Sequence, residues 1–212
     1  YVGYPLVVKP ISGNHGRGIT TNVMNETDAL EAFHAAKKVS NSVIVEKFIT
    51  GDDYRLLVIN YKLVAAAKRT PAHVVGDGKS TIQELIDVVN QDPKRGYGHE
   101  KVLTMIDVND LTRSILDEAG KILEDILKKG EVFNLKDTAN LSTGGTAEDV
   151  TDIVHPYNIF MAERIARIID LDICGIDIMT TDIGQPLPDT GGAVIEANAG
   201  PGFRMHLDPA EG

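Results

Sequence analysis

An acid and an amide that could bind a cation lie two residues apart near the end of the chain, at Glu196 and Asn198. Residues 193–198 predict a short strand that enters a Gly/Pro loop, and alternate side chains of a strand point to the same face. Two oxygen donors aimed at one point suit a hard cation such as Mg²⁺, which usually also holds substrate phosphates. The alternative is the polar face of an ordinary edge strand.

A third candidate ligand, Asp177, lies on another strand, predicted at residues 173–180. Alternation places Asp177 on the face opposite Ile176 and Ile178, which point towards a core. Proline and glycine residues at 182–191 predict a turn, after which the later strand returns antiparallel.

In an antiparallel hairpin, residues at equal distances on either side of the turn pair with each other. This rule pairs Asp177 with Glu196 or Asn198, so the three polar side chains share one face. The same pairing puts Ile195 on the apolar face. Oxygen ligands that converge from two strands predict a magnesium site, and a carboxylate such as Glu196 can bridge two ions that draw charge from ATP phosphates.

The start of the chain offers a phosphate-binding pattern. An apolar strand at residues 6–10 carries a lysine and precedes a loop with three glycines in six residues. Glycine lets backbone N–H groups converge on an anion, although the loop lacks the ending of a Walker motif. An ordinary hairpin tip is the alternative. The candidate residues are Lys9, Gly13, Asn14, His15, Gly16, Arg17 and Gly18.

A nucleotide site would also need an adenosine pocket. Residues 42–46 predict a buried strand, and the connector that follows could offer backbone groups to adenine. Asp53 could accept hydrogen bonds from ribose hydroxyls. The candidate adenine-binding residues are Glu46, Lys47, Phe48 and Ile49.

Two β-runs predict a hairpin, at residues 53–59 and 62–69. With a two-residue turn, Asp53 and Arg55 share a face with Lys68. Arg69 then lies on the other face, and a one-residue shift of register would exchange the two basic residues.

The remaining patterns predict an α+β protein. Ser80-Thr81 followed by Glu84 is a capping box that opens a helix. Hydroxyls and glycines at 138–146 form a loop that could bind an oxyanion, or only a linker. A helix is predicted at 26–39, with Ala29, Leu30, Phe33 and Ala36 on one stripe. Further helices are predicted at 109–129, with a break at Gly120, and at 155–169. A strand is predicted at 132–136.

Composition excludes several classes of function. The 212 residues include 31 acidic and 21 basic side chains, and no basic run that would suit a nucleic acid. Cys174 is the single cysteine, which excludes an internal disulfide and fits a reducing cytoplasm. No apolar stretch has the length of a membrane helix. The chain begins at Tyr1, which suggests a piece of a larger protein.

Together these motifs resemble the ATP-grasp superfamily of carboxylate–amine ligases, and within it the cyanophycin synthetase family. The resemblance extends across nearly the whole chain. The matching stretches include Val7-Val8-Lys9-Pro10, Gly13-Asn14-His15-Gly16-Arg17-Gly18, Asp53-Tyr54-Arg55, Ser142-Thr143-Gly144-Gly145-Thr146, Gly175-Ile176-Asp177 and Gly200-Pro201-Gly202-Phe203-Arg204-Met205-His206.

The resemblance implies two α+β lobes whose antiparallel sheets grip ATP, with the N-terminal part of the usual fold missing. Residues 1–48 would form the small lobe with the Gly-rich loop, and residues 49–212 the large lobe with the metal ligands. ATP and Mg²⁺, as two ions, are the implied cofactors. The implied partners are aspartate, a peptide acceptor, and the N-terminal region and Mur-ligase-like domain of a parent protein. Neither a nucleic acid nor a membrane is implied, and a homo-oligomer is left open.

The implied reaction is phosphorylation of a carboxylate followed by attack of an amine, which adds aspartate to a poly-aspartate backbone. Related ligases have an arginine two residues before the first metal carboxylate, where this chain has Gly175. The compensating candidates are Arg55, Arg69 and Arg204. Lys136 is a further catalytic candidate, which would contact the growing peptide or the acyl phosphate. The candidate substrate-binding residues are Ser142, Thr143, Gly144, Gly145, Gly200 and Gly202.

Two alternatives stay open. The same ATP motifs would serve another amino-acid ligase, such as a glutathione-synthetase-like or dipeptide ligase. The missing arginine at Gly175 also admits a non-catalytic ATP-binding module.

Overall fold

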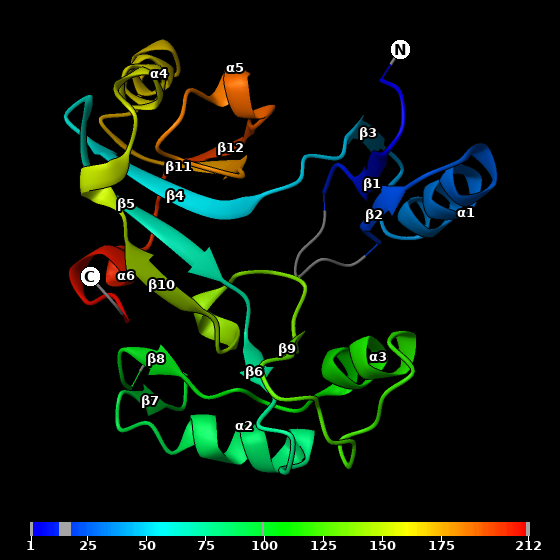
Figure 1. Cartoon of the computed structure of the whole chain (residues 1–212). Coiled ribbons are helices and arrows are strands. Elements are labelled where there is room, and N and C mark those ends of the chain that lie inside the picture. The colour runs from blue at the N-terminus through cyan, green and yellow to red at the C-terminus, as the bar shows by residue number, and fades with distance from the viewer. Residues whose placement is uncertain (1, 13–17, 99, 211–212) are drawn as a thin grey trace. The chain divides into compact units, whose positions relative to one another are not determined.

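The computed structural model describes the chain except for residues 1, 13–17, 99 and 211–212. The chain divides into two compact units, Tyr1–Thr50 and Gly51–Gly212 (Figure 1). Each unit has a hydrophobic core of its own, so each is described by itself.

In the first unit, an antiparallel sheet of order β2-β1-β3 packs against one helix, α1. The small core consists of Leu6, Val8, Val23, Ala32 and Ala36. Asn25 caps the helix, because its side chain accepts a hydrogen bond of 3.0 Å from the backbone N–H of Asp28. The bounds are β1 Leu6–Pro10, β2 Thr20–Val23, α1 Glu26–Lys37 and β3 Val43–Lys47.

Two predictions for this unit were wrong. The predicted helix stripe included Leu30 and Phe33, which are 55% and 39% exposed, because α1 faces the sheet with its small residues Ala32 and Ala36. The predicted strand at 42–46 is not buried, since Val45 is 43% exposed. Within the described residues of this unit, one helix covers the sheet, so much of β3 stays accessible.

The second unit is built on a five-stranded antiparallel sheet of order β10-β5-β4-β11-β12. Helix α4 packs across β4, β5 and β11, and His155 caps its N-terminus by accepting a hydrogen bond from the Tyr157 N–H (Figure 1). The bounds are β4 Asp52–Ile59, β5 Lys62–Thr70, β10 Thr146–Asp149, α4 Pro156–Ile168, β11 Ile173–Thr180, α5 Leu187–Thr190 and β12 Ala193–Asn198.

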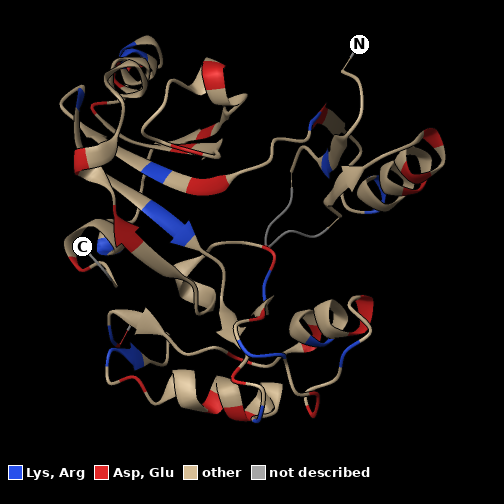
Figure 2. Ribbon diagram, viewed as in Figure 1, with Lys and Arg blue, Asp and Glu red and all other residues tan. Residues whose placement is uncertain are grey.

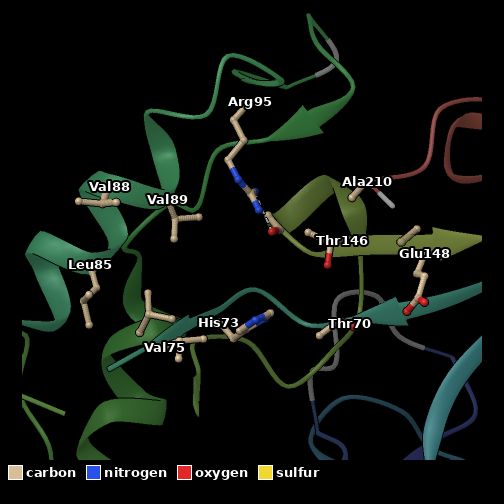
Figure 3. A pocket seen from close by; sticks show the side chains of 13 residues that line it. Thr70, His73, Val75, Leu85, Val88, Val89, Arg95, Thr146, Glu148 and Ala210 are labelled. Carbon is tan, nitrogen blue, oxygen red and sulfur yellow. Dashed lines mark hydrogen bonds between the residues drawn. The ribbon is translucent and has the colours of Figure 1, made fainter. Parts of the chain in front are cut away.

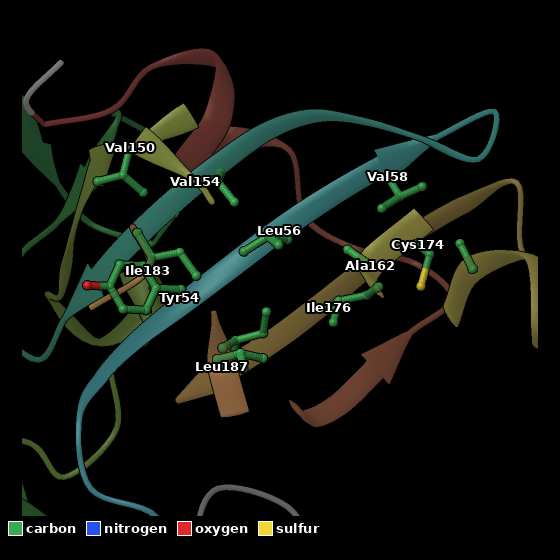
Figure 4. Close-up of a cluster of buried hydrophobic side chains, with 13 residues drawn as sticks. Tyr54, Leu56, Val58, Val150, Val154, Ala162, Cys174, Ile176, Ile183 and Leu187 are labelled. Carbon is green, nitrogen blue, oxygen red and sulfur yellow. The ribbon is translucent and has the colours of Figure 1, made fainter. Parts of the chain in front are cut away.

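Alternating apolar residues of β4 and β11 form the main core between the sheet and α4 (Figure 4). This confirms the core face predicted for the strand at residues 173–180, and the structure adds the matching face of β4. The core residues of the two strands are Tyr54, Leu56, Val58, Cys174, Ile176 and Ile178. The opposite face of the same strands is therefore the one that carries the polar residues.

The β4–β5 hairpin has the predicted two-residue turn, with positive φ of 51° at Asn60 and 59° at Tyr61. Of the two registers that the sequence left open, the structure has the one shifted by a residue, because a bulge between Leu57 and Val58 shifts the pairing. Asp53 consequently lies opposite Arg69 instead of Lys68.

Residues 71–136 contribute a second group of elements with a core of their own, which includes Val74, Ile82, Ile86, Leu127 and Leu135. The predicted capping box is confirmed: Thr81 accepts from the Glu84 N–H, and Glu84 accepts from the Thr81 N–H at 2.8 Å. The bounds are β6 His73–Val75, α2 Ile82–Asn90, β7 Arg95–Gly96, β8 Leu103–Thr104, α3 Asp110–Glu118 and β9 Val132–Asn134.

Three further local predictions need correction. Helix α3 ends at Glu118, and the following residues to 129 form turns, because Asp125 accepts from the Ile122 N–H and Ile126 bridges to Thr81. The loop predicted at 138–146 contains a 3-10 turn at Leu141–Thr143 and leads into β10, which was missed. The turn at 182–191 contains α5.

None of the helices in the described part of the chain combines the length and the apolar character needed to cross a membrane.

The main core gives a stability test. Ile176 is fully buried, so Ile176→Ala should lower the free energy of unfolding by about 2–5 kcal/mol through lost burial and a residual cavity. Urea denaturation measures this change, with Ile168→Ala as control, since Ile168 is 71% exposed and should change stability by less than about 0.5 kcal/mol. Equal effects of the two substitutions would contradict the assigned core face.

Candidate active site

The sheet face opposite the main core gathers charged side chains from three adjacent strands. We call Asp53, Arg55, Arg69 and Asp177 the charged face, since their registers place them side by side. Figure 2 shows the basic residues of β5 next to the acidic residues of β4. Strand alternation accounts for Asp53, Arg55 and Asp177, because each of them is next in the sequence to a core residue of β4 or β11. Arg69 joins them because it lies opposite Asp53.

Asp177 is the centre of the charged face. Its carboxylate accepts two hydrogen bonds from Arg55, one from Nε and one of 2.9 Å from Nη2. Arg69 Nη2 lies 3.1 Å from Asp177 Oδ2, the oxygen that also accepts from Arg55 Nη2. Both arginines are only 9% exposed, so a buried carboxylate is held between two buried guanidinium groups.

Arg69 also connects Asp177 to Asp53. Its Nε and Nη2 atoms donate to Asp53 Oδ1 at 2.9 and 2.5 Å. Burial raises the pKa of Asp53, and the charge of Arg69 opposes that shift. Asp53 therefore interacts with Arg69, and its contact with ribose hydroxyls stays a prediction.

Gly175 explains how Arg55 reaches Asp177. A Cβ atom at Gly175 would lie 3.1 Å from Arg55 Cδ and 2.7 Å from Pro201 Cβ, closer than side chains normally pack. The absence of a side chain at Gly175 makes room for Arg55, whose guanidinium then lies beside Asp177. Arg55 thus places a positive charge where Gly175 cannot supply one.

The strands of the predicted metal site pair as expected. Asp177 lies opposite Glu196, and Gly175 lies opposite Asn198, so the three candidate ligands share a face. Glu196 is exposed and accepts a hydrogen bond of 2.8 Å from the Asn198 side chain. Two carboxylates and an amide oxygen are hard donors that fit Mg²⁺. Among the described residues, no cluster of three or more His, Cys, Asp or Glu side chains is arranged to hold a metal, so the amide of Asn198 is needed to complete this set.

The prediction that Ile195 faces the core was wrong. A register shift between Asp177 and Ile178 leaves Ile195 without a partner, and its side chain is 43% exposed. Val194 packs against the core in its place. The bulge keeps Glu196 on the side of Asp177 while the strand continues.

In the first unit, the candidate phosphate and adenine residues have local partners. Lys9 Nζ lies 2.5 Å from Glu46 on the neighbouring strand, and the Phe48 N–H donates to the Pro5 carbonyl at 2.9 Å. Glu46 and Lys47 belong to β3, so the predicted connector begins only at Phe48 and Ile49. Gly18 has a positive φ of 74°. The candidates Gly13, Asn14, His15, Gly16 and Arg17 lie outside the described residues.

A cavity of about 480 Å³ brings together Lys136, Ser142 and Thr143. Lys136 is 2% exposed and its ammonium donates to Thr112 Oγ1, Asn109 Oδ1 and the Asp107 carbonyl at 2.7, 2.8 and 3.2 Å. Burial lowers the pKa of Lys136. No carboxylate oxygen is among these contacts, so Lys136 brings a positive charge to the cavity wall.

The loop at residues 142–146 borders a second cavity, of about 570 Å³, which is lined by residues of α2, β6 and β10 (Figure 3). An arginine contact on this side holds the loop in place. Arg95 donates to the Gly144 carbonyl at 2.9 Å and to the Thr104 carbonyl at 2.6 Å. Gly144 has a φ of 97°, and a Cβ at Gly145 would lie 2.8 Å from two carbonyl oxygens. Both glycines are therefore required by the backbone of this loop.

The segment after β12 was predicted to bind substrate. Open space surrounds the Cα atoms of Gly200 and Gly202, where a Cβ would meet nothing within 4 Å. Pro201 is buried against Gly175, and Arg204 begins a short helix, α6 Arg204–Leu207.

His206, in the same segment, has a partly buried side chain that no pattern in the sequence predicts. Both of its ring nitrogens are buried without a hydrogen-bond partner among the described residues. Its signal in the sequence was its place in the Arg-Met-His ending, which by itself specifies no contact.

No family model matches the chain, but several known proteins are similar to it over almost all of its length. Cyanophycin synthetase of Crocosphaera subtropica is 56% identical over 212 residues, which cover 99% of this chain and 24% of the relative. A bifunctional glutathione biosynthesis protein of Clostridium perfringens is 34% identical over 98% of this chain and 27% of that protein. The chain thus spans about a quarter of the length of the curated relatives it matches.

Among solved structures, the chain is similar to a bifunctional glutathione synthetase from Pasteurella multocida. The two share a TM-score of 0.69 and 34% identity over 98% of this chain and 28% of that one. The chain is therefore similar, over almost all of its length, to one segment of a cyanophycin synthetase and to one segment of a bifunctional glutathione synthetase.

Proposed function

We propose that the chain is the ATP-grasp module of a longer ligase that forms amide bonds through an acyl phosphate. The observation that carries the proposal is the arrangement around Asp177, where two buried arginines and the neighbouring ligands Glu196 and Asn198 meet on one sheet. Phosphoryl transfer depends on such positioning and charge neutralisation more than on a protein nucleophile.

In the proposed reaction, a substrate carboxylate attacks the γ-phosphorus of ATP and ADP leaves. An amine then attacks the acyl phosphate, an amide forms, and phosphate departs. Mg²⁺ at Asp177, Glu196 and Asn198 would supply positive charge to the ATP phosphates. Arg55 and Arg69 hold fixed charges beside these ligands and would stabilise negative charge that develops on the transferring group.

The first unit would contribute Lys9 and the glycine-rich loop to phosphate binding, and residues 46–49 to adenine binding. In this reading the small lobe comprises residues 1–48 and the large lobe residues 49–212. The compact units Tyr1–Thr50 and Gly51–Gly212 support this division.

For the substrate, we propose that aspartate is added to a poly-aspartate acceptor, as the 56% identity to cyanophycin synthetase supports. The acceptor peptide would contact the cavity wall formed by Lys136, Ser142 and Thr143, where the Lys136 ammonium suits an acidic chain. The N–H groups of Gly200 and Gly202 would bind a substrate carboxylate.

The second candidate is an amino-acid ligase of the glutathione synthetase type, supported by the lower identity of 34%. A screen of ADP release with different acceptors separates the two. Activity with a dipeptide acceptor and none with an aspartate-rich primer would overturn the cyanophycin assignment. ATP binding without ADP release for any acceptor would instead indicate a non-catalytic module.

The proposed metal site predicts a loss of nucleotide affinity. Asp177→Ala and Glu196→Gln should each weaken Mg²⁺-dependent ATP binding by more than tenfold, because each removes a metal ligand. Isothermal titration of Mg·ATP measures the affinity, and Asp189→Ala, an exposed carboxylate on α5, should leave it unchanged. Wild-type affinity in both variants would remove the triad from the site.

The role of Arg55 predicts a loss of rate. Arg55→Lys should lower the rate of ADP release by roughly 100-fold, because lysine cannot form the two-pronged contact with Asp177. The matched control is Arg167→Lys, which changes an arginine over the ring of Tyr61. If both variants of the full-length protein keep the wild-type rate, Arg55 has no part in the reaction.

A further inference from the structure

Helix α6 lies against β5 and β10 on the side of the charged face. Met205 packs against Ala67 and Ala147, and the registers place Ala67 opposite Arg55 and Ala147 opposite Arg69. Directly opposed residues of a sheet share a face. His206, the next residue of the helix, lies near enough to Arg55 and Arg69 for their charges to act on its imidazole.

His206 has an unmet hydrogen-bonding capacity. Nδ1 and Nε2 are both buried, and neither has a partner among the described residues. A buried polar atom without a partner typically costs about 1–3 kcal/mol, so such atoms are uncommon and usually have a reason. Within the described residues, no other buried side-chain nitrogen or oxygen is left in this state.

The surroundings of the imidazole keep it neutral. Burial lowers the pKa of His206 to about 4, and the positive charges of Arg55 and Arg69 act in the same direction, against the charge of Asp149. Asp149 itself accepts hydrogen bonds from the Thr151 hydroxyl at 2.6 Å and from its N–H at 2.8 Å. A neutral imidazole offers one N–H donor and one acceptor nitrogen.

We propose that His206 is a substrate-binding residue whose imidazole N–H donates a hydrogen bond to a carboxylate oxygen of the substrate beside Arg55 and Arg69. The ring nitrogens of His206 are left without a partner among the described residues, whereas the guanidinium groups beside it already bind Asp177 and Asp53, so the hydrogen bond to the substrate comes from the imidazole. The proposal rests on the proposed ligase function. The carboxylate belongs either to the end of the acceptor peptide or to the incoming amino acid.

The test compares His206→Phe with His206→Gln in the full-length protein. Phe removes both hydrogen-bonding groups and keeps a ring, whereas Gln keeps a donor and an acceptor. We expect His206→Phe to raise the KM for one carboxylate substrate about tenfold or more, with unchanged Mg·ATP affinity, and Gln to restore most of the loss. A raised KM for an aspartate-rich primer identifies the acceptor end, and a raised KM for aspartate identifies the amino acid.

The control is His34→Phe, an exposed histidine of α1. Wild-type KM values in His206→Phe would overturn the proposal. Equal losses in the Phe and Gln variants with a lowered melting temperature would overturn it as well, since both point to packing. A loss confined to Mg·ATP affinity would assign His206 to the nucleotide and likewise contradict the proposal.

A separate measurement keeps this inference apart from the proposed function. If the wild-type protein releases no ADP with any acceptor, the ligase function fails. Titration of an aspartate-rich peptide and of aspartate into wild type and His206→Phe then decides the inference. Binding of either one weakened about tenfold supports the assignment, and equal or absent binding of both overturns it.

Discussion

The ion-pair network around Asp177 is the constraint on which the rest of the second unit depends. Two guanidinium groups and two carboxylates would be costly to bury singly, and they are tolerated because each neutralises another. The network needs Gly175 to leave space for Arg55, and it needs strands β4, β5 and β11 in one register. The same strands place their other side chains in the main core, so packing on one face orders charge on the other.

Two register shifts determine which polar side chains of this sheet lie opposite each other. The bulge in the β4–β5 hairpin brings Arg69 opposite Asp53, and the shift in β11–β12 keeps Glu196 opposite Asp177 while Val194 returns to the core. Bulges commonly redirect side chains next to functional sites. Both shifts lie close to the candidate ligands, and α6 then covers the β5–β10 end of the charged face.

Short-range patterns in the sequence predicted the strands that carry Asp177 and Glu196, because alternation and a turn rich in proline and glycine determine which residues oppose each other. The side of Arg69 and the exposure of Ile195 could not be predicted, since each depends on one extra residue in a strand. His206 was missed for a different reason. Its environment is formed by residues from β5 and β10 that are distant in the sequence, and no local pattern reports such burial.

The central claim is that this arrangement of charges serves the formation of an acyl phosphate. Transfer of an oxygen isotope tests it most directly. With both carboxylate oxygens of the acceptor labelled with ¹⁸O, the full-length protein should release phosphate that carries one labelled oxygen for each amide bond formed. The oxygen that attacks phosphorus leaves with the phosphate, so label in the phosphate reports the intermediate. Amide formation with unlabelled phosphate would contradict the mechanism.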